Sequence, residues 1–439
     1  MVHWSLTSTN VFALMDQTDL FLESLFNRFI QGCQLEDRLP QLPISTHGKT
    51  LILAIGKAAV QLAEACETQL LKRFDGEFPA QGILLCRQGE HNNCQHFRTF
   101  FAAHPLPDQG SLVAAQSIIN ATQRLQKDDQ LICLLSGGGS SLFSYPASGI
   151  APEEKRHICQ ALLLSGANIE DINCVRKHIS YVKGGQLAKL AYPATVNTYA
   201  ISDVVGDKAD VIASGPTVAD PSHQAQALDI LKRFNIELPD SVAKYLSNAH
   251  NETPKPGDPC FADNHFDILL SPAQAFAEFT QIFQLEHSHI ELHYLGSELE
   301  DDAQDLAREH AQVALNIAAC RPQKPQLILS GGEATVDVQG NGRGGPNTEY
   351  ALALALALDG QSGIYGLAAD TDGIDGCGDN AGALIGPQTL AQNKTEAQQY
   401  LQNNDSYGFF KRFGGLLLCG PTYTNVNDFR VILVLPEKH

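Results

Sequence analysis

A chain of 439 residues is too long for one ordinary hydrophobic core, so its length favours two domains. Hydrophobic residues make up 44% and charged residues 18%, which is usual for a folded globular protein and excludes a disordered chain. Thirty basic against forty-nine acidic residues give a net charge of −19, which repels nucleic acids and anionic membranes at long range. We therefore expect no nucleic-acid and no membrane partner, and an anionic substrate would need a local cluster of basic side chains.

The cysteines indicate a reducing compartment. Eleven of them are dispersed between Cys33 and Cys419 without a CxxC pair or a Cys/His group of metal-ligand spacing. The first residues, MVHWSLTSTNVF, lack a basic stretch followed by an apolar one, and no apolar run approaches the roughly 18 residues needed to span a bilayer. We expect reduced thiols, no zinc site and a cytoplasmic location.

Two glycine-rich stretches each close an apolar strand. Leu131–Leu142 reads LICLLSGGGSSL, which predicts a buried strand, a turn and a helix start, and Leu327–Val336 reads LILSGGEATV. The first N–H groups of a helix have no partner within it, and glycines let a ligand approach the main chain, so such turns suit an anion. The alternative is a turn that binds nothing. The predicted cofactor-binding residues are Ser136, Gly137, Gly138, Gly139, Ser140, Ser141, Gly331, Gly332 and Glu333.

Two cations occupy positions that favour ligand binding. Lys57 follows the apolar strand Thr50–Ile55 and precedes a helix that continues to Leu70. A positive charge at a helix N-terminus opposes the helix macrodipole, which favours a functional over a structural role for Lys57. Arg343 lies among glycines in NGRGGPN, so its guanidinium projects from a bare backbone and suits bidentate phosphate contact.

A further basic group lies in the stretch NCVRKH, which is followed by KGG. Arg176 and Lys177 in this stretch supply local positive potential for a substrate or a phosphate, although a run of charges is ordinarily a solvated helix face. His104 lies in the turn sequence HPLPD. It can contact a substrate there, or it can be a turn histidine held by its own backbone.

Acidic residues follow two other predicted strands. Asp203 and Asp207 come just after the strand Thr195–Ile201, where carboxylates can hold Mg²⁺, accept a hydroxyl proton or cap a helix. Asp203, nearer the strand end, is the preferred functional group. Asp370 opens the pattern D-x-D-x-x-D, which lacks the Glu of a calcium loop because Asp379 stands in its place. Mg²⁺ carried by a nucleotide fits this group better.

The order of the elements predicts two domains. Strand and helix patterns alternate on both sides of the polar stretch Leu238–Pro259, which indicates two α/β domains with mostly parallel sheets, residues 1–245 and 246–439. An amphipathic helix over Leu14–Ile30 is expected to pack against the first sheet. The stretch Thr348–Leu358 is apolar on every side, which predicts a buried helix.

Taken together, these motifs resemble the class II glycerate kinases, the family with a MOFRL-type C-terminal domain. The resemblance covers nearly the whole chain and is specific because so many motifs occur in this order. It rests on IGKAA (Ile55–Ala59), HPLPD (His104–Asp108), LLSGGGSSL (Leu134–Leu142), NCVRKHIS (Asn173–Ser180), KGGQLA (Lys183–Ala188), ISDVVGD (Ile201–Asp207), IASGPTVAD (Ile212–Asp220), LSGGEATV (Leu329–Val336), GRGGPNTEYALALA (Gly342–Ala357), DTDGIDG (Asp370–Gly376) and GPTYTNVNDFRV (Gly420–Val431).

The resemblance implies phosphoryl transfer from ATP, with a nucleotide-bound Mg²⁺, to the 2-hydroxyl of D-glycerate. It also implies a Rossmann-like three-layer N-terminal domain, a smaller MOFRL-like α/β C-terminal domain and an active-site cleft between them. Lys57 and Arg343 match the family's catalytic lysine and arginine. Asp203 is then expected to orient or deprotonate the acceptor hydroxyl. Arg176, Lys177 and His104 are expected to bind the substrate, and Asp207 and Asp370 are candidate metal ligands.

The chain departs from many relatives at three positions, having Gln186 and Pro346 where they carry Arg, and Thr348 where they carry Gln. These departures bear on the acid that is accepted, so a related small sugar acid is an alternative substrate. Some relatives are labelled hydroxypyruvate reductases, but no G-x-G-x-x-G follows a strand with an acidic residue about 20 positions later. A non-catalytic sugar-acid sensor is a third alternative. The sequence leaves the assembly state open, with a homodimer as one option.

Overall fold

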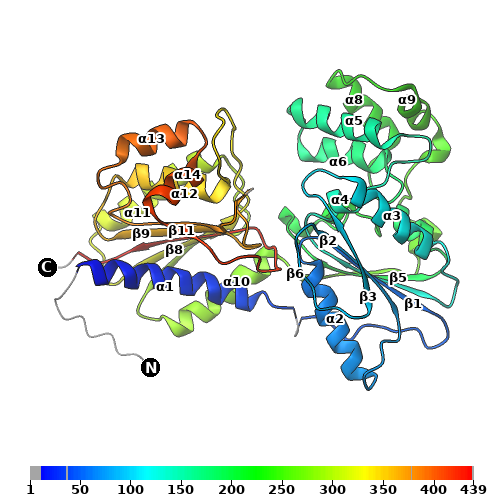
Figure 1. The fold of residues 1–439 in the computed structure, drawn as a ribbon, viewed down its shortest axis with the longest axis horizontal. Helices are drawn as coiled ribbons and strands as arrows, with labels where there is room; N and C mark the ends of the chain where they lie inside the picture. The colour runs from blue at the N-terminus through cyan, green and yellow to red at the C-terminus, as the bar shows by residue number, and fades with distance from the viewer. Residues whose placement is uncertain (1–10, 36–37, 377, 438–439) are drawn as a thin grey trace. The chain divides into compact units, whose positions relative to one another are not determined.

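The computed structural model describes residues 11–35, 38–376 and 378–437, and these form two compact units (Figure 1). One unit runs from Leu35 to Ser271, and the other combines the chain up to Gln34 with the chain from Pro272 onward. Each unit has its own six-stranded sheet. Within the described residues, no helix is long and apolar enough to cross a bilayer.

The sheet of the first unit is wholly parallel, with the order β3-β2-β1-β4-β5-β6. Its strands are β1 (Thr50–Ile55), β2 (Gln81–Arg87), β3 (Phe97–Ala102), β4 (Gln130–Leu135), β5 (Thr195–Ile201) and β6 (His265–Leu270). Strand β1 is buried along its whole length, as its unbroken apolar sequence requires when helices cover both faces. The predicted Rossmann-like, three-layer architecture is confirmed for this unit.

The first unit contains two sets of helices. One set packs against the strands of the sheet and consists of α2 (Ala59–Arg73), α3 (Gln109–Thr122), α4 (Gly139–Leu142) and α7 (Gln186–Ala191). A second set has a hydrophobic core of its own and groups together in Figure 1; it consists of α5 (Pro152–Leu164), α6 (Ile169–His178), α8 (Gln224–Arg233) and α9 (Asp240–Leu246). The second set brings the NCVRKH stretch, on α6, into the first unit.

The sheet of the second unit is mixed, with the order β11-β10-β9-β12-β8-β7. Its strands are β7 (Glu291–Gly296), β8 (Gln326–Gly332), β9 (Ile364–Asp370), β10 (Gly382–Ile385), β11 (Leu416–Leu417) and β12 (Asp428–Val434). The expectation of a mostly parallel sheet is wrong here, because β12 inserts between β8 and β9 and runs antiparallel to both. Strand β12 follows a loop rather than a crossover helix, so the alternation rule does not apply to it.

Helices cover both faces of the second sheet (Figure 1). One face carries α11 (Ala303–Ala319), α12 (Pro346–Leu358), α13 (Lys394–Gln402) and α14 (Ser406–Phe413), and the other carries α1 (Val11–Gly32) and α10 (Pro272–Glu286). Successive side chains of β12 point to opposite faces of the sheet. Ile432 joins the core beneath α11 and α12, whereas Phe429 meets Phe276 of α10. The buried helix predicted at Thr348–Leu358 is confirmed as the body of α12.

The expected position of the first helix is wrong, because α1 belongs to the second unit. The ring of Phe29 lies 4.8 Å from those of Phe276 and Phe429 and 5.5 Å from that of Phe279, measured between centroids. An apolar helix face indicates burial but not which of two sheets covers it. The compact units also divide the chain at 271/272 rather than at the predicted 245/246, since residues 265–270 form β6 of the first sheet.

This aromatic contact leads to a stability prediction. Phe29→Ala should lower the free energy of unfolding of the second unit by about 3–5 kcal/mol, because it removes a fully buried aromatic side chain from a packed cluster. Differential scanning calorimetry should show the loss as a lower transition temperature. Leu20→Ala on the same helix, where the side chain is 58% exposed, is the matched control and should change little. Equal effects of the two substitutions would contradict the assignment of α1.

Candidate functional site

The turns after β1 and β4 lie together at one edge of the first sheet. These strands are neighbours, and they stand where the strand order reverses direction, which is where open α/β sheets bind ligands. The N–H of Lys57 donates to the carbonyl of Gly137 (2.8 Å), and the N–H of Ala58 donates to Oγ of Ser136 (3.0 Å). The Lys57 turn and the Ser136–Ser141 turn are therefore one connected structure.

Three predicted site residues meet at Gly138. This residue has φ +76°, and a Cβ added to it would lie 2.9 Å from Cγ of Lys57 and 3.1 Å from Cδ2 of His104. Only glycine fits both the backbone angle and the space. The structure thus brings Lys57 and His104 to the same point of the glycine-rich turn.

The helix that follows this turn is short. Helix α4 contains four residues, Gly139–Leu142, so a helix macrodipole contributes little to anion binding there. Other groups support the turn instead. The ammonium of Lys183 donates to the carbonyls of Ser140 (2.6 Å) and Phe143 (3.2 Å), and Oγ of Ser140 is hydrogen-bonded to Oγ of Ser214 (2.8 Å). Lys183 is 1% exposed and was present in the sequence only as part of the KGG motif.

Three basic side chains, Lys155, Arg176 and Lys183, lie near the turn. Burial, with the charge of Arg176 adding to it, lowers the pKa of Lys155 to about 8. Burial and the charges of Lys155 and Arg176 also lower the pKa of Lys183. In the part of the chain that the structure describes, none of the three forms an ion pair with a carboxylate. Because burial lowers the pKa of both lysines, it weakens their positive charge, and the local positive potential that the chain as a whole lacks rests mainly on Arg176.

Lys177, predicted beside Arg176 as a substrate ligand, has another role in the structure. Its ammonium lies 2.8 Å from a carboxylate oxygen of Asp210 and 3.4 Å from one of Asp220, and both Lys177 and Asp220 are buried. Successive residues of a helix point in different directions, so one member of the pair turns inward. Asp210 and Asp220 neutralise the charge of Lys177, so Arg176 is the member of this pair that remains a candidate to bind an anion.

The predicted carboxylates of the first unit follow β5, the neighbour of β4. Asp203 comes two residues after the end of β5, at the same edge of the sheet as the two turns. Asp207 lies in a 3₁₀ turn with φ +53°, and its Oδ1 atom is buried with no hydrogen-bond partner among the described residues. A buried carboxylate oxygen without a partner is costly unless a ligand or water satisfies it.

The second SGG motif is part of a strand rather than a ligand-binding turn. Gly331 and Gly332 end β8 and pair with Phe429 and Asp428 of β12. A Cβ on Gly331 would collide with the ring of Phe276, and one on Gly332 would collide with the backbone of Leu299. Tight internal packing therefore explains these two glycines. Glu333 follows them and is exposed.

Arg343 lies in an exposed loop that is attached to the start of α14. Its N–H donates to Oδ1 of Asp405 (3.0 Å), its carbonyl accepts from the N–H of Tyr407 (3.0 Å), and its Cζ lies 4.4 Å from the centroid of the Tyr407 ring. Sequence reasoning found Arg343 from its glycine neighbours but missed Tyr407, which carries no motif of its own. The guanidinium therefore has a fixed platform within this unit.

Asp370 and Asp375 organise the polar edge of the second sheet. Asp370, at the end of β9, accepts the N–H of Asp372 (2.8 Å). Asp375 is buried and accepts the N–H groups of Asn347 (2.9 Å) and Thr348 (2.8 Å) at the start of α12. No group of three His, Cys, Asp or Glu side chains converges as a metal site within the described ranges. The two predicted metal ligands, Asp207 and Asp370, belong to different units.

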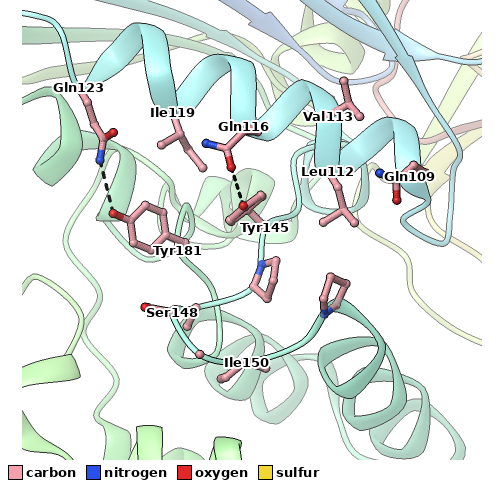
Figure 2. A pocket seen from close by; sticks show the side chains of 14 residues that line it. Gln109, Leu112, Val113, Gln116, Ile119, Gln123, Tyr145, Ser148, Ile150 and Tyr181 are labelled. Carbon is pink, nitrogen blue, oxygen red and sulfur yellow. Dashed lines mark hydrogen bonds between the residues drawn. The ribbon is translucent and has the colours of Figure 1, made fainter.

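A separate cavity of about 800 Å³ lies beside α3 in the first unit (Figure 2). Gln116 and Gln123 of α3 point toward Tyr145 and Tyr181, with which they form hydrogen bonds of 2.5 and 3.4 Å. The lining contains no charged side chain and none of the predicted site residues. This cavity lacks the groups that an anionic ligand requires.

Comparisons with known proteins agree over nearly the whole chain. Residues 23–247 match the family described as a domain of unknown function, DUF4147, and residues 326–428 match the MOFRL family. The chain is 36% identical to the D-glycerate 2-kinase of Thermotoga maritima over 91% of this chain and 94% of that protein. It is 35% identical to the glycerate 2-kinase of Pyrococcus horikoshii, over 89% and 88%.

Two further similarities complete the comparison. An Agrobacterium vitis protein that carries the provisional name hydroxypyruvate reductase is 41% identical, over 90% of this chain and 89% of that protein. The crystal structure of a glycerate kinase from T. maritima matches with a TM-score of 0.82 at 34% identity, covering 96% of this chain and all of that one. The similarity thus extends to both units.

Asp375 provides a pH-dependent prediction for the second unit. Burial, opposed in part by the N–H donors of α12, raises the pKa of Asp375 from 3.8 to about 6. The folded state then holds the proton more tightly than the unfolded state, so the stability from this group is greatest below pH 3.8 and is lost as the pH rises through 6. Relative to Asp375→Asn, the free energy of unfolding of the wild type should fall by about 1 kcal/mol per pH unit between pH 4.5 and 6. Denaturant titrations would measure this difference, and parallel curves would contradict it.

Proposed function

The chain belongs to the glycerate kinase family, and from this premise we propose that it transfers the γ-phosphoryl group of ATP to the 2-hydroxyl of D-glycerate. The observation that carries the proposal is the joining of the Lys57 turn to the Ser136–Ser141 turn at the reversal point of the first sheet. Phosphoryl transfer depends on positioning and on neutralising charge, and this edge of the sheet supplies both.

The residues at this edge fit the phosphates of ATP. Gly137, Gly138 and Gly139 carry no side chains, so phosphate oxygens can approach the main chain where Lys57, His104 and Ala213 do not already pack against it. Arg176 adds positive charge that no described carboxylate neutralises, and the buried Lys155 and Lys183 add to it when they are protonated. Lys183 contributes to the site indirectly, because its ammonium donates hydrogen bonds to the carbonyls of Ser140 and Phe143 and so holds the turn in place.

We assign the remaining roles by charge and position. Lys57 stabilises negative charge on the transferring phosphoryl group, and Arg343 of the second unit contributes the second cation. Asp203 orients the acceptor hydroxyl or removes its proton, and Arg176 binds the substrate carboxylate. His104, packed against Gly138 beside Lys57, contacts the substrate.

Mg²⁺ enters the proposal with the nucleotide. When bound, it neutralises phosphate charge and aligns the phosphates for transfer. The absence of three converging ligand side chains among the described residues favours an ion held mainly by the nucleotide, as magnesium in kinases commonly is. Asp207, with its unpartnered Oδ1 atom, and Asp370 are the protein groups that would hold it.

A reductase is the rival function, favoured by the provisional names of the Agrobacterium vitis relatives. The strand order of the first sheet is also that of dinucleotide-binding folds. The turn after β1 nevertheless reads Gly56-Lys57-Ala58-Ala59-Val60-Gln61, so Ala58 and Gln61 stand where the pattern G-x-G-x-x-G needs its second and third glycines. The two missing glycines argue against a dinucleotide site and leave phosphoryl transfer as the favoured reaction.

Product analysis tests the proposed reaction directly. With Mg-ATP and D-glycerate, we expect ADP release and a 2-phosphoglycerate signal by phosphorus NMR. If ADP is released only with a related acid, such as tartronate, that acid is the substrate, and Gln186 and Pro346 are the residues to which the changed specificity would be assigned. NADH oxidation with hydroxypyruvate, without any ADP release, would instead establish the reductase.

Lys57 provides the sharpest single-residue test. Lys57→Met should lower kcat on the order of 100-fold or more, because it removes a positive charge fixed beside the glycine-rich turn. The circular dichroism spectrum and the thermal transition should remain close to those of the wild type. Lys232→Met, at an exposed lysine of α8, is the matched control and should leave turnover unchanged. Wild-type turnover in the Lys57 variant would remove this residue from the mechanism.

A further inference from the structure

We propose that Tyr407 is a positioning residue for Arg343, and that the start of α14 acts as a platform holding the guanidinium ready for the transferring phosphoryl group. This inference rests on the proposed function for its consequence in catalysis. The contact between Arg343 and Tyr407 lies within the second unit, and it can be measured without any turnover.

The backbone on both sides of Arg343 is tied to this platform. The N–H of Gly342 donates to the carbonyl of Asn403 (2.9 Å), and the N–H of Arg343 donates to Oδ1 of Asp405 (3.0 Å). The carbonyl of Arg343 in turn accepts the N–H of Tyr407 (3.0 Å). Three hydrogen bonds in succession fix the point from which the arginine side chain starts.

The glycines around Arg343 serve the same contact. A Cβ on Gly342 would collide with Asp405, and one on Gly344 would collide with Oγ of Ser406. The sequence pattern suggested a bare backbone for a phosphate to approach, but the structure shows the chain's own segment 403–406 in that space. The glycine-rich loop is therefore bare because it lies directly on α14 and the turn before it.

The side chains complete the platform. The guanidinium lies over the face of the Tyr407 ring, with 4.4 Å between Cζ and the ring centroid. Tyr407 is only 5% exposed, whereas Arg343 is exposed. A guanidinium stacked by its face directs its N–H donors outward from its edge, in the fork geometry that suits a bidentate phosphate contact.

Asp379 and Lys411 lie around the same ring. The hydroxyl of Tyr407 donates to Oδ1 of Asp379 (2.8 Å), which fixes the ring against rotation. This hydrogen bond, together with the charges of Arg343 and Lys411, lowers the pKa of Asp379. The ammonium of Lys411 lies 5.5 Å from the ring centroid. Asp379 thus fixes the Tyr407 ring on which the guanidinium of Arg343 is stacked.

The physical benefit is preorganisation. A free arginine loses considerable side-chain entropy when it is fixed in one orientation, and that cost would otherwise be met during each turnover. A stacked arginine has already lost much of this freedom. The interaction should therefore affect kcat, where the transition-state charge is stabilised, more than KM.

The kinetic test uses three variants. Tyr407→Leu should lower kcat roughly 10- to 100-fold with both KM values within about threefold, because the cation loses its support. Tyr407→Phe should retain kcat within about threefold, since its ring still carries the guanidinium. Phe413→Leu is the matched control: it removes the stacking of Arg412 (4.8 Å) on the same helix and should leave kcat unchanged. Equal losses in the Leu and Phe variants at position 407 would overturn the inference.

A double mutant separates positioning from structure. In an Arg343→Ala background, adding Tyr407→Leu should cause no further loss of kcat, because the group that the ring supports is already gone. An equal further loss would show that Tyr407 acts through the fold instead, and would overturn the inference.

An NMR measurement keeps the inference testable if the proposed function fails. In ¹⁵N-arginine-labelled protein, the Nε–Hε signal absent from Arg343→Lys identifies Arg343. That signal should show a ring-current shift that persists in Tyr407→Phe and disappears in Tyr407→Leu. If the wild-type protein shows the shift but has no kinase activity, the proposed function is refuted and the platform is not. An unshifted signal in the wild type would refute the platform.

Discussion

The candidate site depends on the parallel pairing of β1 with β4. These strands align Ile55 with Leu135, so the turns that follow them leave the sheet side by side. The bonds from Ala58 N–H to Ser136 Oγ and from Lys57 N–H to the Gly137 carbonyl then join the two turns. His104, Lys183 and Ser214 pack against turns that this pairing has already placed, and their roles follow from it.

The charge distribution explains how an acidic chain can bind anionic substrates. The net charge of −19 is spread over the molecule, whereas Lys155, Arg176 and Lys183 lie together near the glycine-rich turn without acidic partners among the described residues. Lys177, one residue from Arg176, shows the contrast because Asp210 and Asp220 neutralise it. Whether a cation serves binding or folding is decided by which acidic groups the fold places beside it.

Patterns local in the sequence predicted the elements well and their pairing less well. The apolar runs of β1 and β4 and the apolar helix α12 were found because burial on every side leaves a direct mark on composition. The same patterns assigned α1 to the wrong sheet and expected parallel strands around β12. An apolar face predicts that the face is buried, but it does not identify the element that covers it, because that element is distant in the sequence. The second SGG motif shows the same limit, because its glycines fit the ring of Phe276 and the backbone of Leu299 rather than a ligand.

By itself, the sequence determined the family, the two α/β units and the chemically distinctive groups: Lys57, the Ser136–Ser141 turn and Arg343. These are visible because a cation beside a predicted strand end or among glycines stands out in the sequence, although only the structure separates a ligand turn from tight packing, as at the second SGG motif. Only the tertiary structure decided which residues support them. Lys183 beneath the turn and Tyr407 beneath Arg343 have no motif of their own, and Lys177 looked like a ligand until its partners were known. The physical reason is that a supporting contact is a relation between distant segments, and its energy depends on distance and burial, which composition and spacing do not encode.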